Sequence, residues 1–365
     1  MEKAVLCVHV FLTLIIVVLL FTLNLQGFHG LSVGDKTDLG QTTTSSFIVY
    51  SDGAYYYSAN SVTGEVLYQD ENCSAVVANL VSLCRENGSI TFKAGIYPCN
   101  FTINKKLCLS GEGRASTVIY GTITLDSTTL KGTPRSHHTL IQNLCLDGQN
   151  RLKTGIEYES LFPTVPLITI QNVDIENYAD YGILFTNASD CLFSNLVIGN
   201  CATAIYYTTN HNFGRVINCE LLNYRVQGLY TDAQIYLSGT VFSAMQVPFT
   251  AADLVLDNAF GTITGCWFEN NNTAPCINMP NTCYRPLIIA GCFLANRGGD
   301  IVVMRNAFSV SMSENFFSQQ TKAQSGYCVH VVQGTLYWNG NQLDPAFSAT
   351  LNDFEIEEGA SVKIT

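Results

Sequence analysis

Short β-rich runs recur about every 21–29 residues from Ser89 onward, and this repeat restricts the folds open to the chain. Each run has an apolar residue, any residue, Asn or Gly, two strand-forming residues and a second apolar residue. The runs are IQNLCLDG (141–148), IQNVDIEN (170–177), FSNLVIGN (193–200), VINCELLN (216–223), LSGTVFSA (237–244), ITGCWFEN (263–270), IAGCFLAN (289–296), SMSENFFS (311–318) and WNGNQLDP (338–345). The pattern predicts an all-β parallel solenoid, in which each repeat is one coil and the coils stack about 4.8 Å apart.

Side chains at equivalent positions of stacked coils form columns, and two columns predict the core. The first is apolar throughout and contains Leu146, Ile175, Ile198, Leu221, Phe242, Phe268, Leu294, Phe316 and Leu343. The second contains Leu144, Val173, Leu196, Cys219, Thr240, Cys266 and Cys292. Glu314 and Asn341 interrupt the second column, so we expect the register to shift, or the core to open, near residue 311. Cys266 and Cys292 are expected to be buried free thiols, because parallel side chains are awkward to bridge.

A third column predicts structural corners. It contains Asn177, Asn200, Asn223, Asn270 and Asn296, each just after an apolar core position. Asn tolerates the left-handed conformation that a sharp corner requires, and stacked amides can hydrogen-bond to each other. We therefore assign these asparagines to corners and not to a functional site.

The segments before the repeats predict export. An apolar run from Ala4 to Leu23 is as long as a bilayer is thick, and Lys3 precedes it, so residues 1–30 are expected to form a signal-anchor transmembrane helix. A cleaved signal peptide is the alternative. We expect a polar stalk over 31–46, a β-hairpin segment over 47–72, a capping helix over 73–88, the solenoid over 89–350 and a C-terminal strand or cap over 351–365. The protein would then lie at the cell surface, or be secreted if the leader is removed.

The net charge and the sequence motifs exclude some classes of binding partner. The net charge of −11 provides no basic face for phosphates, so we expect no nucleic-acid partner. Five Asn-x-Ser/Thr sequons agree with export as a glycoprotein, and the lack of any CxxC pair argues against a zinc ribbon. We expect no cofactor. The oligomeric state stays open, with an oligomer among the arrangements considered.

The segment 89–121 resembles the first coils of the pectate-lyase-like superfamily of right-handed parallel β-helix proteins. The resemblance lies in Ala94-Gly95-Ile96-Tyr97, in the turn Ser110-Gly111-Glu112-Gly113 and in Thr117-Val118-Ile119. It implies a right-handed solenoid whose open N-terminal end is covered by an amphipathic helix. Members include polysaccharide lyases and hydrolases, viral tailspikes and surface proteins. The polygalacturonase, pectate lyase and pectin esterase motifs are absent, so the resemblance implies no particular reaction.

One outward-facing column contains candidate functional residues. The column is Cys145, Asp174, Val197, Glu220, Val241, Trp267, Phe293, Asn315 and Gln342. Asp174 and Glu220 lie two coils apart, roughly 9–10 Å by strand spacing, close to the separation of about 6.5–9.5 Å in inverting glycosidases. Trp267 and Phe293 would extend the same face as a platform for a sugar ring.

Each of these residues also has a purely structural interpretation. Exposed carboxylates usually solvate a sheet, and the aromatic pair could be covered by a loop or a subunit interface. Arg215 and Arg225 could bind an anionic sugar, or simply pair with surface carboxylates. Asp174, Glu176 and Asp180 lack the spacing of a calcium loop, so we expect no metal site. His330 is isolated in the sequence.

Three functions follow from these observations. The first is a membrane-anchored extracellular module that binds a polysaccharide, a cell-surface glycan or another surface partner. The second is a polysaccharide lyase or glycoside hydrolase that uses Asp174 and Glu220. The third is a structural spike of an envelope or a virion.

Overall fold

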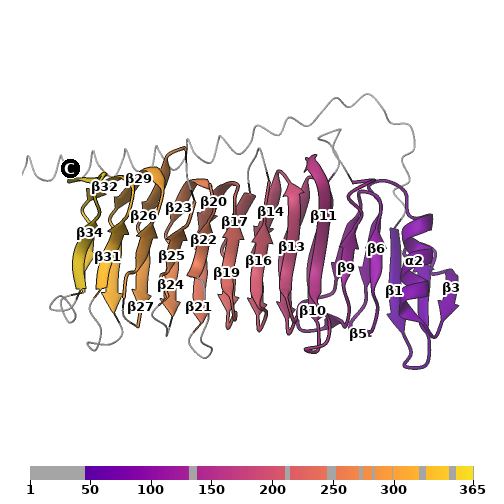
Figure 1. Cartoon of the computed structure of the whole chain (residues 1–365). Coiled ribbons are helices and arrows are strands. Elements are labelled where there is room, and N and C mark those ends of the chain that lie inside the picture. Colours follow the sequence, from indigo (N-terminus) through magenta and orange to yellow (C-terminus); the bar gives the residue numbers. More distant parts are fainter. Residues whose placement is uncertain are drawn as a thin grey trace, which may run out of the picture. The chain divides into compact units, whose positions relative to one another are not determined.

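The computed structural model describes residues 46–130, 138–209, 214–244, 252–270, 274–281, 284–297, 299–319, 326–344 and 351–364. All of the described residues belong to one compact unit, Thr44–Thr365. This unit is a right-handed β-solenoid whose consecutive coils pair in parallel (Figure 1). The solenoid predicted from the repeats is confirmed.

The coils have three faces, which we call first, second and third in the order in which the chain visits them. The first face contains β3 (Val66–Asp70), β2 (Tyr56–Asn60), β1 (Ser46–Ser51), β4 (Ser89–Phe92), β7 (Cys108–Gly111), β14 (Cys191–Ser194), β17 (Gly214–Ile217), β20 (Gln234–Ser238), β23 (Phe260–Thr264), β26 (Leu287–Ala290), β29 (Ala307–Ser313), β32 (Gly334–Asn339) and β35 (Ala360–Ile364). The second contains β5 (Gly95–Tyr97), β8 (Thr117–Ile119), β15 (Val197–Gly199), β18 (Glu220–Leu222), β21 (Val241–Ala244), β24 (Trp267–Asn270), β27 (Phe293–Asn296), β30 (Phe316–Gln319) and β33 (Gln342–Leu343).

Two long strands, β10 (Thr139–Asp147) and β12 (Ile168–Glu176), run through both the first and the second face, which therefore form one 24-stranded sheet. The third face is a separate 11-stranded sheet. It contains β6 (Phe101–Ile103), β9 (Ile123–Leu125), β11 (Thr154–Thr164), β13 (Tyr181–Ala188), β16 (Thr203–Tyr207), β19 (Gln227–Thr231), β22 (Ala252–Leu256), β25 (Ile277–Met279), β28 (Val302–Met304), β31 (Gly326–Val331) and β34 (Leu351–Ile356).

The first predicted core column is present, with one correction. Ile175, Ile198 and Leu221 pair in register on successive coils and are fully buried. Toward the C-terminus, however, Leu294 pairs with Phe317 and not with Phe316. The prediction placed the run 311–318 one residue too early, because two adjacent phenylalanines fit the apolar position equally well. Phe317 is the core residue.

The same correction changes the second core column. Glu314 is exposed and lies outside it, and the buried Asn315 takes the position that follows Cys292. Asn341 takes the next position. The pairing of this column continues through the two asparagines. A local register shift does occur nearby, between Ala307 and Ser309 of β29, so the expected shift lies in the first face and does not interrupt the core column. Cys266 and Cys292 are buried free thiols, as predicted.

The bend between the first and second faces uses one left-handed residue per coil. These residues are Asn143, Asn172, Asn195, Asn218, Gly239, Gly265, Gly291, Glu314 and Gly340. Asn and Gly tolerate positive φ, which explains why the repeat has Asn or Gly at its third position.

The corners predicted at the later asparagine column are present only in part. Asn177, Asn200 and Asn223 have positive φ. The amide of Asn200 donates to Oδ1 of Asn177 over 3.1 Å, which confirms the expected stacking of amides at this corner. Asn296, in contrast, is fully buried in β27, and its amide donates to the carbonyl oxygens of Ala274 and Asp300.

The N-terminal part of this unit adds three antiparallel strands and a helix to the first coil. β2 pairs antiparallel with β1 on one side and with β3 on the other, and β1 also pairs in parallel with β4. Helix α2 (Cys73–Leu83) contacts these strands and β6, and buries Val76, Val77, Leu80 and Val81. The Asn72 side chain caps it by accepting a hydrogen bond from the backbone of Ser74. The helix predicted over 73–88 is therefore present but shorter.

Two expectations concern the chain ends. The anchor predicted over 1–30 and nearly all of the stalk over 31–46 lie outside the described residues. Within the described ranges, no helix combines the length and apolar character needed to cross a bilayer. At the other end, β34 and β35 pair with β31 and β32, so the coils continue beyond residue 350.

Candidate functional site

The outward column on the second face is present, with Phe316 in place of the predicted Asn315. Backbone pairing joins Asp174, Val197 and Glu220 on successive coils. It then continues through Val241, Trp267, Phe293, Phe316 and Gln342. The sequence therefore placed four of its six candidate residues, Asp174, Glu220, Trp267 and Phe293, on one face.

The aromatic residues of this column stack on each other. The ring centroids of Trp267 and Phe293 are 4.1 Å apart with planes at 20°, and those of Phe293 and Phe316 are 5.7 Å apart with planes at 11°. Trp267 is 44% exposed, and its Nε1 donates to Oε2 of Glu269 over 3.0 Å. Because neighbouring rings cover each other's faces, the column presents mainly ring edges to solvent and is a poor platform for a sugar face.

The carboxylate pair has a partner that the sequence analysis missed. Arg114, from the turn between β7 and β8, forms an ion pair with Asp174, with Nη1 and Oδ1 2.8 Å apart. Partial burial raises the pKa of Asp174, Arg114 opposes this shift, and the charge of Glu220 adds to it. Glu220 is exposed. A carboxyl group with a raised pKa suits a general acid, although the arginine also holds Asp174 in a structural contact.

The two predicted arginines lie elsewhere. Arg215 belongs to β17 on the first face, where it pairs with Leu192 and Tyr236, so it does not share a face with Asp174 and Glu220. Arg225 donates hydrogen bonds to the carbonyl oxygens of Ala179 and Asn200 on neighbouring coils. Arg225 is therefore a structural link between corners.

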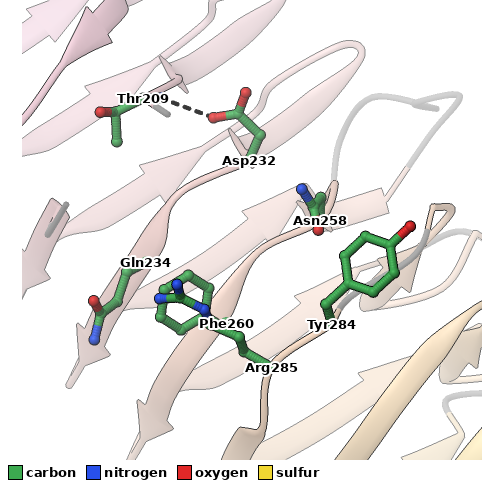
Figure 2. Close-up of a pocket in the computed structure, with 7 residues that line it drawn as sticks. All are labelled: Thr209, Asp232, Gln234, Asn258, Phe260, Tyr284 and Arg285. Carbon is green, nitrogen blue, oxygen red and sulfur yellow. Dashed lines mark hydrogen bonds between the residues drawn. The ribbon is translucent and has the colours of Figure 1, made fainter. Parts of the chain in front are cut away.

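A pocket of about 340 Å³, which we call the corner pocket, lies where the third face turns into the first. Its walls come from successive coils, and Figure 2 shows the side chains around it. The lining residues are Thr209, Asp232, Gln234, Asn258, Phe260, Tyr284 and Arg285. Repetition of the turn places polar groups from different coils side by side along one edge of the solenoid.

An aromatic ring and a cation border one side of the corner pocket. The guanidinium carbon of Arg285 lies 4.5 Å from the centroid of the Phe260 ring, which fixes the direction of the arginine side chain. Tyr284 is 74% exposed, so its ring is open to a ligand. Asn258 is also exposed and has a φ of 62°.

Asp232 provides the negative charge of the corner pocket. Its Oδ1 accepts a hydrogen bond from the backbone of Thr209 over 2.8 Å (Figure 2). Burial raises the pKa of Asp232; that hydrogen bond opposes the shift, and the charge of Asp257 adds to it. The neighbouring Asp257 is held by Tyr230 and Asn281 through hydrogen bonds of 2.6 and 2.7 Å. The pocket thus combines fixed acceptors, amides, a cation and an exposed ring.

The sequence analysis missed the corner pocket because it aligned only the strands. Asp232 and Asn258 come from the turns after β19 and β22, and Tyr284 and Arg285 precede β26. Aligning the residues just before each repeat would have placed Asp232, Asn258 and Tyr284 near one edge.

No protein-family model and no curated protein matches this sequence. Solved structures do match. The A-module of mannuronan C-5 epimerase AlgE4 from Azotobacter vinelandii has a TM-score of 0.55 at 12% identity, over 80% of this chain and 94% of the module. The AlgE6 A-module of the same organism gives 0.51 at 10% identity, over 80% and 93%. The gp42 tailspike of Acinetobacter phage vb_AbaP_AS12 gives 0.52 at 12% identity, over 80% of this chain and 60% of the tailspike.

These similarities concern the fold, because the sequence identities are low. They agree with the parallel pairing of the coils and with the right-handed winding. The chain therefore shares the right-handed parallel β-helix fold of these proteins.

Proposed function

We propose that this protein binds a glycan in the corner pocket. The observation that supports this proposal most directly is the make-up of the pocket: an exposed Tyr284 ring, a cation and three side chains with amide or carboxylate groups around about 340 Å³. A sugar presents hydroxyl groups on its edges and apolar C–H groups on its faces. The first bind carboxylates and amides, and the second pack against an aromatic ring.

The solenoid suits a polymeric ligand. Equivalent turns repeat about every 4.8 Å along the edge, so that a chain of sugars lying along the coils would meet the pocket and the turns beside it. The mannuronan C-5 epimerase modules and the phage tailspike have the same fold, which makes a polysaccharide the ligand class to test first.

The test is a glycan-array screen of the full-length protein, followed by isothermal titration calorimetry with each captured glycan. Tyr284→Ala removes the exposed ring, and Asn258→Gly removes an amide while suiting the positive φ at that position. Phe162→Ala is the matched control, because Phe162 is 73% exposed on β11 and does not line the corner pocket.

We expect Tyr284→Ala to weaken binding at least about tenfold, which corresponds to about 1.4 kcal/mol, and Asn258→Gly to weaken it less. Phe162→Ala should bind like the wild type. The proposal fails if no glycan is captured, or if Tyr284→Ala binds a captured glycan as tightly as the control does.

An enzyme acting on a polysaccharide is the second candidate, and the raised pKa of Asp174 favours it. In this proposal Asp174 is the general acid and Glu220 the general base, two coils apart on the second face. A reducing-end assay on captured glycans tests it. Retention of full activity by both Asp174→Asn and Glu220→Gln would exclude this pair.

We also propose that the protein is displayed outside the cell through its N-terminal segment. The apolar run from Ala4 to Leu23 supports an anchor, and the sequon at the exposed Asn72 is accessible for glycosylation. Protease protection of the full-length protein in membranes tests this orientation. A rigid spike is the remaining interpretation, and symmetric trimers in electron micrographs would favour it.

A further inference from the structure

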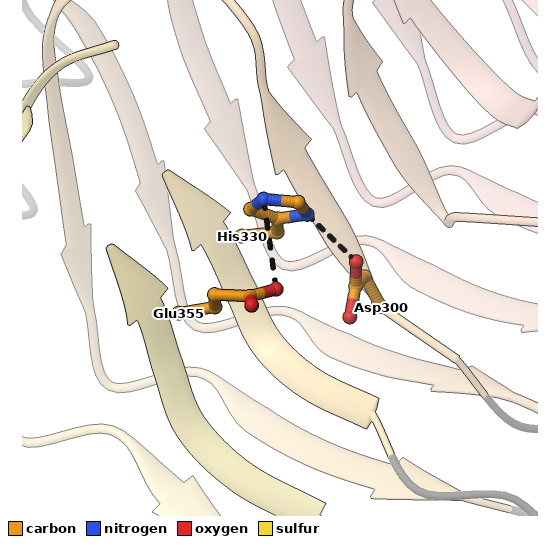
Figure 3. Close-up of side chains that lie close together, drawn as sticks. All are labelled: Asp300, His330 and Glu355. Carbon is orange, nitrogen blue, oxygen red and sulfur yellow. Dashed lines mark hydrogen bonds and ion pairs between the residues drawn. The ribbon is translucent and has the colours of Figure 1, made fainter. Parts of the chain in front are cut away.

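His330 has no neighbouring carboxylate in the sequence, but the fold surrounds it with three. It lies on β31 of the third face, and backbone pairing places Glu355 of β34 directly beside it. Asp300 precedes β28, and Glu357 follows β34. Figure 3 shows the imidazole ring between Asp300 and Glu355. Residues from three successive coils therefore meet at one point of the surface.

The hydrogen bonds give the two ring nitrogens different roles. Nδ1 of His330 lies 2.9 Å from Oδ2 of Asp300, and Oδ1 of Asp300 accepts from the backbone of Tyr327 over 3.2 Å. A carboxylate only accepts, so Nδ1 carries a proton. This arrangement resembles the usual outer support of a metal-bound histidine, whose second nitrogen donates to a carboxylate.

The other nitrogen faces two more carboxylates. Nε2 lies 2.9 Å from Oε1 of Glu357 and 3.6 Å from Oε2 of Glu355. In a neutral imidazole with its proton on Nδ1, the Nε2 lone pair would point at these negative oxygens, so the close contact requires either a second proton on Nε2 or a cation bound between Nε2 and the oxygens. In the described part of the chain, no lysine or arginine forms an ion pair with Asp300, Glu355 or Glu357.

We propose that His330, Glu355 and Glu357 bind a divalent transition-metal ion, with Asp300 as the positioning residue for the histidine. One imidazole nitrogen and two carboxylates are a ligand set for zinc or manganese, whereas calcium prefers oxygen ligands alone. The side chains of Glu355 and Glu357 are 44% and 50% exposed, so solvent can reach the site and water can complete the coordination. This proposal departs from the sequence-based expectation of no metal site.

Such an ion would fasten the C-terminal end of the solenoid. Glu355 is in β34, the last strand of the third face, and Glu357 begins the turn that leads to β35. His330 is one coil earlier. The metal would thus link the last coils through side chains, where no further coil follows in the described residues.

Zinc is the probe of choice, because His nitrogen and carboxylate oxygen are among its usual protein ligands and it undergoes no redox chemistry. Isothermal titration calorimetry of the full-length protein, stripped with a chelator, measures zinc uptake by the wild type, His330→Gln and Glu357→Gln. Glu358→Gln is the matched control, since Glu358 is the next acidic residue and is not among the carboxylates that contact His330 in the described residues.

We expect one tight zinc equivalent in the wild type and in Glu358→Gln, and its loss in His330→Gln and Glu357→Gln. Asp300→Ala should weaken zinc affinity about 10- to 100-fold, while Asp300→Asn, which keeps an oxygen acceptor for Nδ1, should weaken it less. Zinc should also raise the thermal unfolding midpoint of the wild type and not that of Glu357→Gln.

Two results would overturn the proposal. One is a wild-type protein that takes up no zinc, which would leave His330 as a charged link between carboxylates. The other is equal zinc affinity in the wild type and Glu357→Gln, which would place the ion elsewhere.

Discussion

Nδ2 of Asn315 donates a hydrogen bond to Oδ1 of Asn341 over 2.8 Å, so an amide pair joins two successive coils inside the core. The same Nδ2 lies 3.0 Å from the carbonyl oxygen of Ile289, and Oδ1 of Asn315 accepts from the backbone of Cys292 over 2.9 Å. Asn315 is only 1% exposed. These bonds allow a polar residue to occupy a position that is apolar in earlier coils.

Asn315→Ala should therefore lower the free energy of unfolding by about 2–5 kcal/mol, because it leaves buried backbone groups without partners. Urea denaturation followed by circular dichroism measures the change. Asn339→Ala is the control, because Asn339 is exposed on β32, and it should change the free energy by less than about 0.5 kcal/mol. Similar values for the two variants would contradict the structural role of the amide pair.

Glu314→Gly should stabilise the protein by about 1 kcal/mol. Glu314 has a φ of 56° at a bend that uses Asn or Gly in the other coils, and a non-glycine residue in this conformation costs about 1–2 kcal/mol. The reverse change, Gly265→Ala, should destabilise by a similar amount, since a Cβ at Gly265 would meet no atom within 4 Å and only the backbone conformation changes. Thermal denaturation of both variants checks the pair. A Glu314→Gly variant that is less stable than the wild type, or a Gly265→Ala variant that is more stable, would refute the conformational argument.

The two tryptophans should differ in quenching by acrylamide. Trp267 is 44% exposed, whereas Trp338 is 6% exposed and its ring stacks on that of Phe317 with centroids 5.3 Å apart. Trp267→Phe should remove the quenchable fluorescence and leave blue-shifted emission, and Trp338→Phe should do the reverse. Equal quenching in the two variants would mean that Trp267 is covered, as a subunit interface on the second face would cause.

Cys145 should resist alkylation in the native protein. It is 7% exposed, and burial, assisted by the charges of Glu176 and Asp174, raises the pKa of its thiol to about 12. At pH 8 only about one thiol in ten thousand would then be a thiolate, the form that reacts. Iodoacetamide labelling followed by peptide mass spectrometry should show labelling in urea but not under native conditions.

The sign of the pH dependence follows from the same shift. An unfolded cysteine has a pKa of about 8.5, so the stability that the neutral thiol of Cys145 contributes is complete below about pH 8.5. It is lost as the pH rises toward about 12. Native labelling should increase about tenfold per pH unit over this range. A rate at pH 8 that equals the rate in urea would contradict the raised pKa.

The proposed sites differ in how much of them the sequence could show. The outward column of the second face was predictable because Asp174, Glu220 and Trp267 occupy one position of a regular repeat. The prediction put Phe316 in the core column instead of the outward column, because Phe316 and Phe317 are adjacent and the pattern alone could not distinguish them. The contact between Arg114 and Asp174 joins residues 60 positions apart in the sequence, and Arg114 lies in a turn. The repeat pattern therefore gave no means of predicting it.

The sequence by itself determined that the chain forms a solenoid, how many residues each coil contains and most of the core. The reason is that burial requires an apolar residue at the same position of nearly every coil. The column of Ile175, Ile198 and Leu221, which pair on successive coils, is an example of this requirement. Only the tertiary structure decided the corner pocket and the cluster around His330. Their residues lie in turns and on outward positions, where burial imposes no pattern and where stacking brings together side chains some 25–30 residues apart.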